Sequence, residues 1–193
     1  GFGGSCFKKD ILNLVYLSRY YGLNEVADFW QETLKINVWQ KNRIYKEIVE
    51  RLFGNLAEKK IAILGFAFKE NTNDTRESPA IEICKNLLKE GALLNIHDCK
   101  VDKETINNEL LNSGCIDEKL SWSYKDNIYS ALEETHAAIL ITEWSLYQTI
   151  NWEEILPKLK KPFWIFDTRL ILNPKEINKL GINIWQVGYG NNG

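Results

Sequence analysis

The chain contains few histidines and cysteines, the residues on which most metal sites and all disulfides depend. It contains two histidines, His97 and His136, and four cysteines, none of them in a Cys-x-x-Cys pair, so no metal site is expected. At this length and cysteine content a disulfide scaffold is not expected either, which points to a reducing, cytoplasmic setting. Methionine is absent and the sequence begins at Gly1. We therefore expect a piece of a longer protein.

Strong charge and long apolar runs are missing as well. The 193 residues carry a formal net charge of −2, and the basic residues are scattered, so nothing attracts the chain to nucleic acid or to an anionic membrane. No apolar run approaches the length that spans a bilayer, and no signal-peptide pattern opens the chain. The hydrophobic content of 45% is typical of a soluble globular protein.

The first ten residues carry the strongest chemical signal. Glycines at positions 1, 3 and 4 precede Ser5 and Cys6, and glycine allows a ligand to approach the backbone closely. We predict that Ser5 caps a helix and that Cys6 is its first residue, where the helix dipole favours the thiolate. Asp10 lies four residues further along the same face. The pattern indicates a nucleophile with a carboxylate helper, although most lone cysteines are buried structural residues.

The chain divides into two parts with different periodicity. Residues 6–53 show helical spacing of apolar side chains. We expect their many aromatic residues to pack against another surface, either the following domain or a second subunit. Beyond residue 59, short apolar runs alternate with helical segments, which predicts an α/β fold with a Rossmann-like parallel sheet. We place the boundary between 1–54 and 55–193. The predicted strands lie at 61–65, 93–96, 137–142, 163–167 and 182–187, with a sixth near 121–124.

Ligands of open α/β sheets bind at the carboxyl ends of the strands. The loop after the first strand lacks the GxGxxG fingerprint of dinucleotide sites. It does place Phe68, Lys69 and Arg76 before a helix start, a set that suits a base and phosphates as well as it suits a charged surface loop. Arg169 follows the strand at 163–167, either as a phosphate ligand or as a partner of Asp167.

A thiol hydrolase needs a histidine base, and neither His97 nor His136 has the sequence neighbourhood of a catalytic triad. A thiolate without histidine can instead add to an aldehyde and form a thiohemiacetal. Loss of hydride then gives a thioester, which water opens, and Asp10 would orient or deprotonate that water. The hydride acceptor would be a nicotinamide, for which these residues show no site.

Three motifs together resemble one family. The run from Gly1 to Asp10 is similar to the cysteine motif GFGGSCFxKD of the UDP-glucose 6-dehydrogenases, in the UDP-glucose/GDP-mannose dehydrogenase family. The run from Phe66 to Pro79 is similar to the second signature of that family, and the residues from Phe166 to Arg169 to its FDxR segment. The resemblance covers all 193 residues, and the elements occur in the same order.

The resemblance implies oxidation of UDP-glucose to UDP-glucuronate with two NAD. It makes Cys6 the nucleophile and Asp10 the group that assists with water. It assigns the nucleotide sugar to one set of residues: Gly1, Phe2, Gly3, Phe68, Lys69 and Arg169. It places a second set near NAD: Cys6, Phe7, Lys8, Lys9 and Arg76.

The resemblance also implies a division of labour. Residues 1–54 would form the cysteine loop and a long central helix that makes a homodimer, and residues 55–193 a UDP-sugar-binding domain. An NAD-binding domain would lie outside this sequence, so this piece alone would not catalyse the oxidation. Two alternatives remain at this stage: a non-catalytic nucleotide-sugar-binding or dimerisation module, or a dehydrogenase of GDP-mannose or UDP-N-acetylmannosamine.

Overall fold

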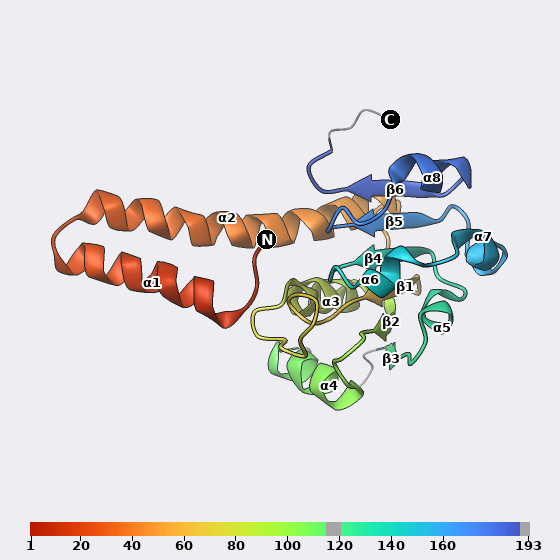
Figure 1. Ribbon diagram of the computed structural model, residues 1–193, viewed down its shortest axis with the longest axis horizontal. Helices are drawn as coiled ribbons and strands as arrows, with labels where there is room; N and C mark the ends of the chain where they lie inside the picture. The colour runs from red at the N-terminus through yellow and green to blue at the C-terminus, as the bar shows by residue number, and fades with distance from the viewer. Residues whose placement is uncertain (115–120, 190–193) are drawn as a thin grey trace.

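The computed structural model describes residues 1–114 and 121–189, and it joins a long helical hairpin to a layered α/β unit (Figure 1). The helices are α1 (Ser5–Tyr20), α2 (Asn24–Arg51), α3 (Pro79–Lys89), α4 (Lys103–Asn112), α5 (Ile128–Leu132), α6 (Ser145–Gln148), α7 (Trp152–Ile155) and α8 (Pro174–Lys179). A 3-10 turn, Leu156–Lys158, follows α7. The strands are β1 (Lys60–Leu64), β2 (Leu93–His97), β3 (Trp122–Tyr124), β4 (Ala137–Leu140), β5 (Trp164–Asp167) and β6 (Asn183–Gln186).

The six strands form one parallel sheet in the order β3-β2-β1-β4-β5-β6. The order reverses direction between β1 and β4, as in doubly wound dinucleotide folds. The predicted Rossmann-like class is confirmed, and so is the sixth strand. All four residues of β4 are buried, which explains why it reads as an unbroken apolar run. Cys115, one of the four cysteines, lies outside the described residues.

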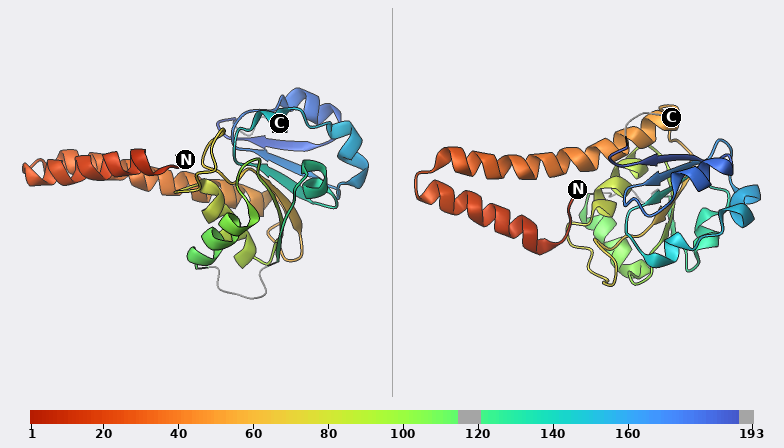
Figure 2. Two further views of the ribbon diagram at one scale, coloured as in Figure 1. Left: turned by 60° about the horizontal axis from the view of Figure 1, so that its bottom comes forward. Right: turned by 45° about the horizontal axis from the view of Figure 1, so that its top comes forward.

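Helices cover both faces of the sheet. The helices α3 and α4 lie on one side, and α5 to α8 lie on the other (Figure 2), as right-handed crossovers require. The C-terminal part of α2 joins the core through Ile44, Ile48 and Leu52, and the Arg51 guanidinium lies 5.0 Å from the centre of the Trp164 ring on β5. The rest of α2 runs beyond the sheet.

The helices α1 and α2 pack as an antiparallel hairpin that projects from the α/β unit (Figures 1 and 2). Ile11 and Val15 of α1 and Ala27 of α2 are the buried apolar residues of its projecting part. The N-terminal end of α1 is the end nearest the α/β unit. The residues before it therefore lie near the middle of α2 and beside the loop that follows β1 (Figure 1). Within the described ranges, no helix has both the length and the apolar character that crossing a bilayer requires.

Asp98, directly after β2, ties the strand ends together. Its buried carboxylate accepts hydrogen bonds from the N–H groups of Phe66 (2.6 Å) and Ala67 (3.1 Å) in the loop after β1. It also accepts from the N–H groups of Lys100 and Val101 and from the indole of Trp144. In dinucleotide folds an acid near this position binds a ribose. Here the carboxylate is committed to the protein itself.

Replacing this carboxylate tests its structural role. Asp98→Ala leaves five donors without their acceptor, so we expect the free energy of unfolding to fall by about 3 kcal/mol or more. The matched control is Asp102→Ala, which removes an exposed cap that accepts from Thr105 N–H and should cost about 1 kcal/mol. Urea unfolding followed by circular dichroism measures both values, and equal losses would contradict the assignment.

Candidate active site

The helix α1 begins one residue earlier than the sequence predicts. Gly4, not Ser5, is its N-cap, with φ of 79° and no side-chain capping bond, and Cys6 is therefore the second helical residue. The reason is steric. A Cβ on Gly4 would lie 2.9 Å from the Phe68 ring, and the Gly4 N–H donates to the Arg76 carbonyl at 2.9 Å, so the chain turns into the helix at the glycine.

Cys6 and Asp10 lie in the first turns of α1 and are both exposed. Their spacing of four residues puts them on one helix face, as expected. Arg76 lies beside the helix start, because its carbonyl accepts from the Gly4 N–H at 2.9 Å, and its hydrogen bond to Asp74 raises the pKa of its guanidinium. The helix start thus presents an accessible thiol beside a cation.

The glycine run lies against the loop that follows β1. A Cβ on Gly3 would be 2.8 Å from the Glu77 carbonyl oxygen, 3.0 Å from Phe68 Cβ and 3.2 Å from Pro79 Cδ, so no other residue fits there without movement. The glycine run therefore lies against Phe68, Glu77 and Pro79.

Phe68, Lys69 and Arg169 form one cluster. Arg169 Nη2 donates to the Phe68 carbonyl at 3.4 Å, and the Lys69 ammonium lies 5.5 Å from the centre of the Phe68 ring. Arg169 Nε donates to the Ile141 carbonyl and lies 3.2 Å from Glu143 Oε2, an ion pair without the geometry of a hydrogen bond. The guanidinium thus reaches across the strand ends toward the loop after β1.

Asp167, at the end of β5, is one of the two partners that the sequence suggests for Arg169. Its buried carboxylate accepts from the backbone N–H groups of Arg169 and Leu172 and from the Gln186 side chain. Asp167 therefore shapes the turn after β5 and leaves the guanidinium of Arg169 directed elsewhere. Arg169 is thus a partner of Asp167 through its backbone N–H, while its side chain pairs with Glu143, and its role as a phosphate ligand stays a prediction.

The residues predicted to lie near a nicotinamide dinucleotide are distributed around the first turn of α1 and the loop beside it. Phe7 is 52% exposed, and Lys9 is exposed. Lys8 pairs with Glu77 (Nζ to Oε1, 2.7 Å), and Arg76 pairs with Asp74 (Nη2 to Oδ2, 2.7 Å). An exposed ring among cations suits one part of a dinucleotide.

Both histidines have structural partners. His97 Nδ1 lies 3.0 Å from the Tyr147 hydroxyl in the core, and His136 Nδ1 accepts from the Lys60 N–H at 3.2 Å. Cys99 is the other exposed cysteine among the described residues, and burial together with the charge of Asp98 raises its pKa to about 11. Among the residues that the structure describes, no group of three or more histidine, cysteine or acidic side chains comes together to hold a metal ion.

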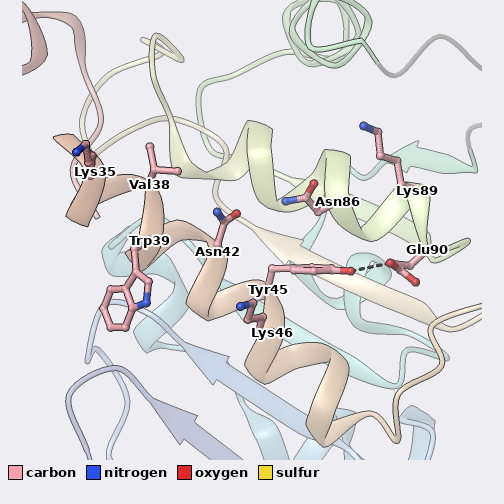
Figure 3. A pocket seen from close by; sticks show the side chains of 9 residues that line it. All are labelled: Lys35, Val38, Trp39, Asn42, Tyr45, Lys46, Asn86, Lys89 and Glu90. Carbon is pink, nitrogen blue, oxygen red and sulfur yellow. Dashed lines mark hydrogen bonds between the residues drawn. The ribbon is translucent and has the colours of Figure 1, made fainter. Parts of the chain in front are cut away.

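A groove of about 540 Å³ lies between α2 and α3, on another face of α2 (Figure 3). Trp39, Asn42 and Lys89 line it, and the Tyr45 hydroxyl donates to Glu90 at 2.7 Å across it. Burial, the hydrogen bond from Tyr45 and the Glu90 charge raise the pKa of Tyr45 to about 12. None of the predicted site residues lines this groove.

Two residues that contact the cysteine loop were missed by sequence reasoning. Asn37 of α2 holds the backbone of Phe2, and Glu77 approaches Gly3 with its carbonyl and Lys8 with its carboxylate. Glu77 has a φ of 57°, a backbone conformation that its residue type does not predict. Asn37 did leave a signal, because asparagine is a poor helix former in the interior of a long helix.

Comparison with known proteins places these features in a family. Residues 62–174 match the family model described as "UDP-glucose/GDP-mannose dehydrogenase family, UDP binding domain". The UDP-glucose 6-dehydrogenase of Drosophila melanogaster is 42% identical over 192 residues, which is 97% of this chain and 40% of that protein. The UDP-glucose 6-dehydrogenase of Caenorhabditis elegans is also 42% identical, over 97% of this chain and 39% of that protein.

A solved structure of the same family has a similar fold. The UDP-glucose dehydrogenase of the hyperthermophilic archaeon Pyrobaculum islandicum is similar with a TM-score of 0.69 and 26% identity, over 89% of this chain and 35% of that one. The chain thus spans about 40% of the length of the curated relatives it matches. With its six-stranded sheet and its matched UDP-binding region, the chain belongs to the UDP-glucose/GDP-mannose dehydrogenase family.

Proposed function

We propose that this chain is the cysteine-bearing, nucleotide-sugar-binding part of an NAD-dependent UDP-glucose 6-dehydrogenase. The observation that carries the proposal is the placement of an exposed Cys6 and Asp10 at a helix start that packs against Phe68, whose carbonyl accepts a hydrogen bond from Arg169. The names of the curated relatives at 42% identity favour UDP-glucose over the other nucleotide sugars. Residues 1–54 would then carry the cysteine loop and dimerisation helices, and residues 55–193 the UDP-sugar domain.

In this proposal the edge of the sheet holds the substrate. Arg169 and Lys69 supply donors for the phosphate oxygens of UDP-glucose, and the Phe68 ring offers an apolar face. The glycine run, Gly1 to Gly3, lines the path of the sugar, since its backbone is free of side chains except for Phe2. The substrate would enter as UDP-glucose and leave as UDP-glucuronate.

Cys6 and Asp10 would carry the second oxidation. The thiolate of Cys6 adds to the aldehyde carbon at C6 of the sugar and forms a thiohemiacetal. Loss of hydride converts this adduct to a thioester, and a water molecule held by Asp10 then attacks the thioester carbonyl and releases the carboxylate. NAD, when bound, supplies the hydride acceptor for both oxidations.

The described residues fit only part of that cofactor. Phe7, Lys8, Lys9 and Arg76 give an exposed ring and cations around Cys6. The loop after β1 has no glycine fingerprint, and Asp98 is committed to backbone N–H groups. We propose that most of the contacts to NAD come from a further domain of the complete protein.

A second copy of the chain would cover the projecting hairpin. Large apolar side chains of α1 and α2 are exposed, among them Tyr16 (65%), Phe29 (66%) and Trp39 (59%). Exposed apolar surface of this kind is typical of an interface, and we propose a homodimer built on α1 and α2. We also propose a cytoplasmic location, which the low cysteine content of the sequence favours.

The nucleophile is tested in the complete gene product. Cys6→Ser should lower UDP-glucuronate formation by about 1,000-fold or more, because serine offers only an un-ionised hydroxyl at neutral pH, which is a much weaker nucleophile than a thiolate. Cys99→Ser is the matched control and should retain normal turnover, since the raised pKa keeps the Cys99 thiol protonated. Chromatographic assay of UDP-glucuronate measures both, and normal product formation by Cys6→Ser would refute the nucleophile.

The nucleotide site is tested by calorimetry with UDP on the complete protein. Arg169→Ala removes a guanidinium that phosphate oxygens can use, so we expect the Kd for UDP to rise by about 10- to 100-fold. Arg43→Ala is the control, because that guanidinium lies over the Trp39 ring at 5.7 Å, and its Kd should match wild type. An unchanged Kd for Arg169→Ala would remove Arg169 from the site.

The dimer is tested by one charge on the hairpin. Phe29→Glu places a carboxylate on the proposed interface, so we expect the complex to dissociate to smaller species in sedimentation velocity, since burying an unpaired charge is costly. Leu146→Glu changes a comparably apolar residue, 48% exposed on α6, and should leave the mass unchanged. A wild-type mass for Phe29→Glu would count against the hairpin as the interface.

A further inference from the structure

Asn37 occupies an unusual place in the interior of α2. Asparagine forms helices poorly, because its amide competes for backbone hydrogen bonds. Here the amide is used across the hairpin. Asn37 Oδ1 accepts from the Phe2 N–H at 2.7 Å, and Asn37 Nδ2 donates to the Phe2 carbonyl at 3.1 Å. Both backbone groups of a single residue are thus satisfied by one side chain from 35 residues away.

The helical register explains how this side chain reaches the cysteine loop. Residues four and seven positions further along share the face of Asn37, and these are Lys41 and Ile44. Ile44 is buried in the core of the α/β unit, and Lys41 Nζ contacts the Glu77 carbonyl at 3.4 Å. One face of α2 therefore runs from the core, past the loop after β1, to the cysteine loop.

Phe2 connects this face to the helix that carries the thiol. Its ring packs edge-on against Phe7, with 4.7 Å between the ring centres, and Phe7 is the neighbour of Cys6. On the other side of Phe2, the Gly4 N–H is held by the Arg76 carbonyl. The backbone between Gly1 and Gly4 is thus fixed from α2 at one end and from the sheet unit at the other.

Gly1 shows how closely Asn37 approaches. A Cβ on Gly1 would lie 2.5 Å from Asn37 Oδ1 and 3.3 Å from both the Asn37 carbonyl oxygen and Lys41 Cγ. Real Cβ atoms do not come as near as 2.5 Å to another heavy atom. A side chain at position 1 would therefore push the amide away from Phe2, so Gly1 and Asn37 act as one unit.

We propose that Asn37 is a positioning residue for Cys6: its amide clamps the Phe2 backbone and so fixes the helix start against the nucleotide-sugar site. The inference rests on the proposed function for its catalytic consequence. Asn37 itself does not contact the thiol. It acts through Phe2 and Phe7, and a small displacement of a nucleophile lowers the rate strongly even when substrate binding is intact.

The test uses the complete gene product with Asn37→Ala. We expect kcat for UDP-glucose oxidation to fall by about 10- to 100-fold, while KM for UDP-glucose stays within about threefold of wild type because Phe68, Lys69 and Arg169 are untouched. Asn42→Ala is the matched control: it makes the same change on the same helix, but Asn42 points into the groove beside α3 (Figure 3). That variant should retain wild-type kcat.

A double-substitution cycle adds a specific signature. Gly1→Ala should lower kcat about as much as Asn37→Ala, because the new methyl displaces the amide. In Gly1→Ala/Asn37→Ala the clashing Oδ1 is gone, so the second change should add less than about threefold to the loss. Fully additive losses would mean that Gly1 and Asn37 act separately and would overturn the clamp.

Hydrogen exchange gives a readout that does not depend on turnover. The Phe2 amide should exchange faster in Asn37→Ala than in wild type or Asn42→Ala, with the thermal midpoint of Asn37→Ala near that of Asn42→Ala. The positioning role would be overturned if the exchange rate of the Phe2 amide or kcat were unchanged in Asn37→Ala. It would also be overturned if the thermal midpoint of Asn37→Ala fell well below that of Asn42→Ala, because unfolding would then explain the loss of kcat. If the wild-type protein fails to oxidise UDP-glucose, the proposed function fails, whereas faster exchange in Asn37→Ala still supports the clamp.

Discussion

The close packing of the glycine run on Phe68 is the contact on which the candidate site depends. Cys6 belongs to a hairpin that projects from the α/β unit, while Lys69 and Arg169 belong to the strand ends. These two parts can share a substrate only if the backbone at Gly3 and Gly4 lies within van der Waals distance of Phe68. Side chains there would separate the thiol from the strand ends by their own thickness.

Much of this arrangement could be predicted from the sequence, because it depends on local patterns. The strands at 61–65 and 137–142 were visible as apolar runs, and the helical spacing of residues 6–53 predicted the helices that precede the sheet. The start of α1 was misplaced by one residue, because the ring that excludes a side chain from Gly4 comes from Phe68, 64 residues further on. Neither a capping rule nor helical periodicity contains that contact.

Side-chain partnerships across the fold were the other part that the sequence could not show. Arg169 lies two residues after Asp167, yet its guanidinium contacts Ile141, Glu143 and Phe68. The sheet order, which sets β4 between β1 and β5, brings these residues together, and it emerges only when the strands assemble. The same assembly surrounds the carboxylates of Asp98 and Asp167 with hydrogen-bond donors, so these two acids at strand ends serve the architecture.

The clamp between Phe2 and Asn37 also closes a loop of chain that contains the whole of α1. Closing a loop across 35 residues costs on the order of 4 kcal/mol of chain entropy, whereas two neutral hydrogen bonds return about 0.5–1.5 kcal/mol each. The packing of Ile11 and Val15 against α2 must therefore hold the loop closed, and the clamp acts on a hairpin that is already formed. The two bonds together hold the clamp closed by about 1–3 kcal/mol, so it can open in roughly one molecule in five to one in 160 without unfolding α1, and the cysteine loop can leave α2 locally while the hairpin stays folded.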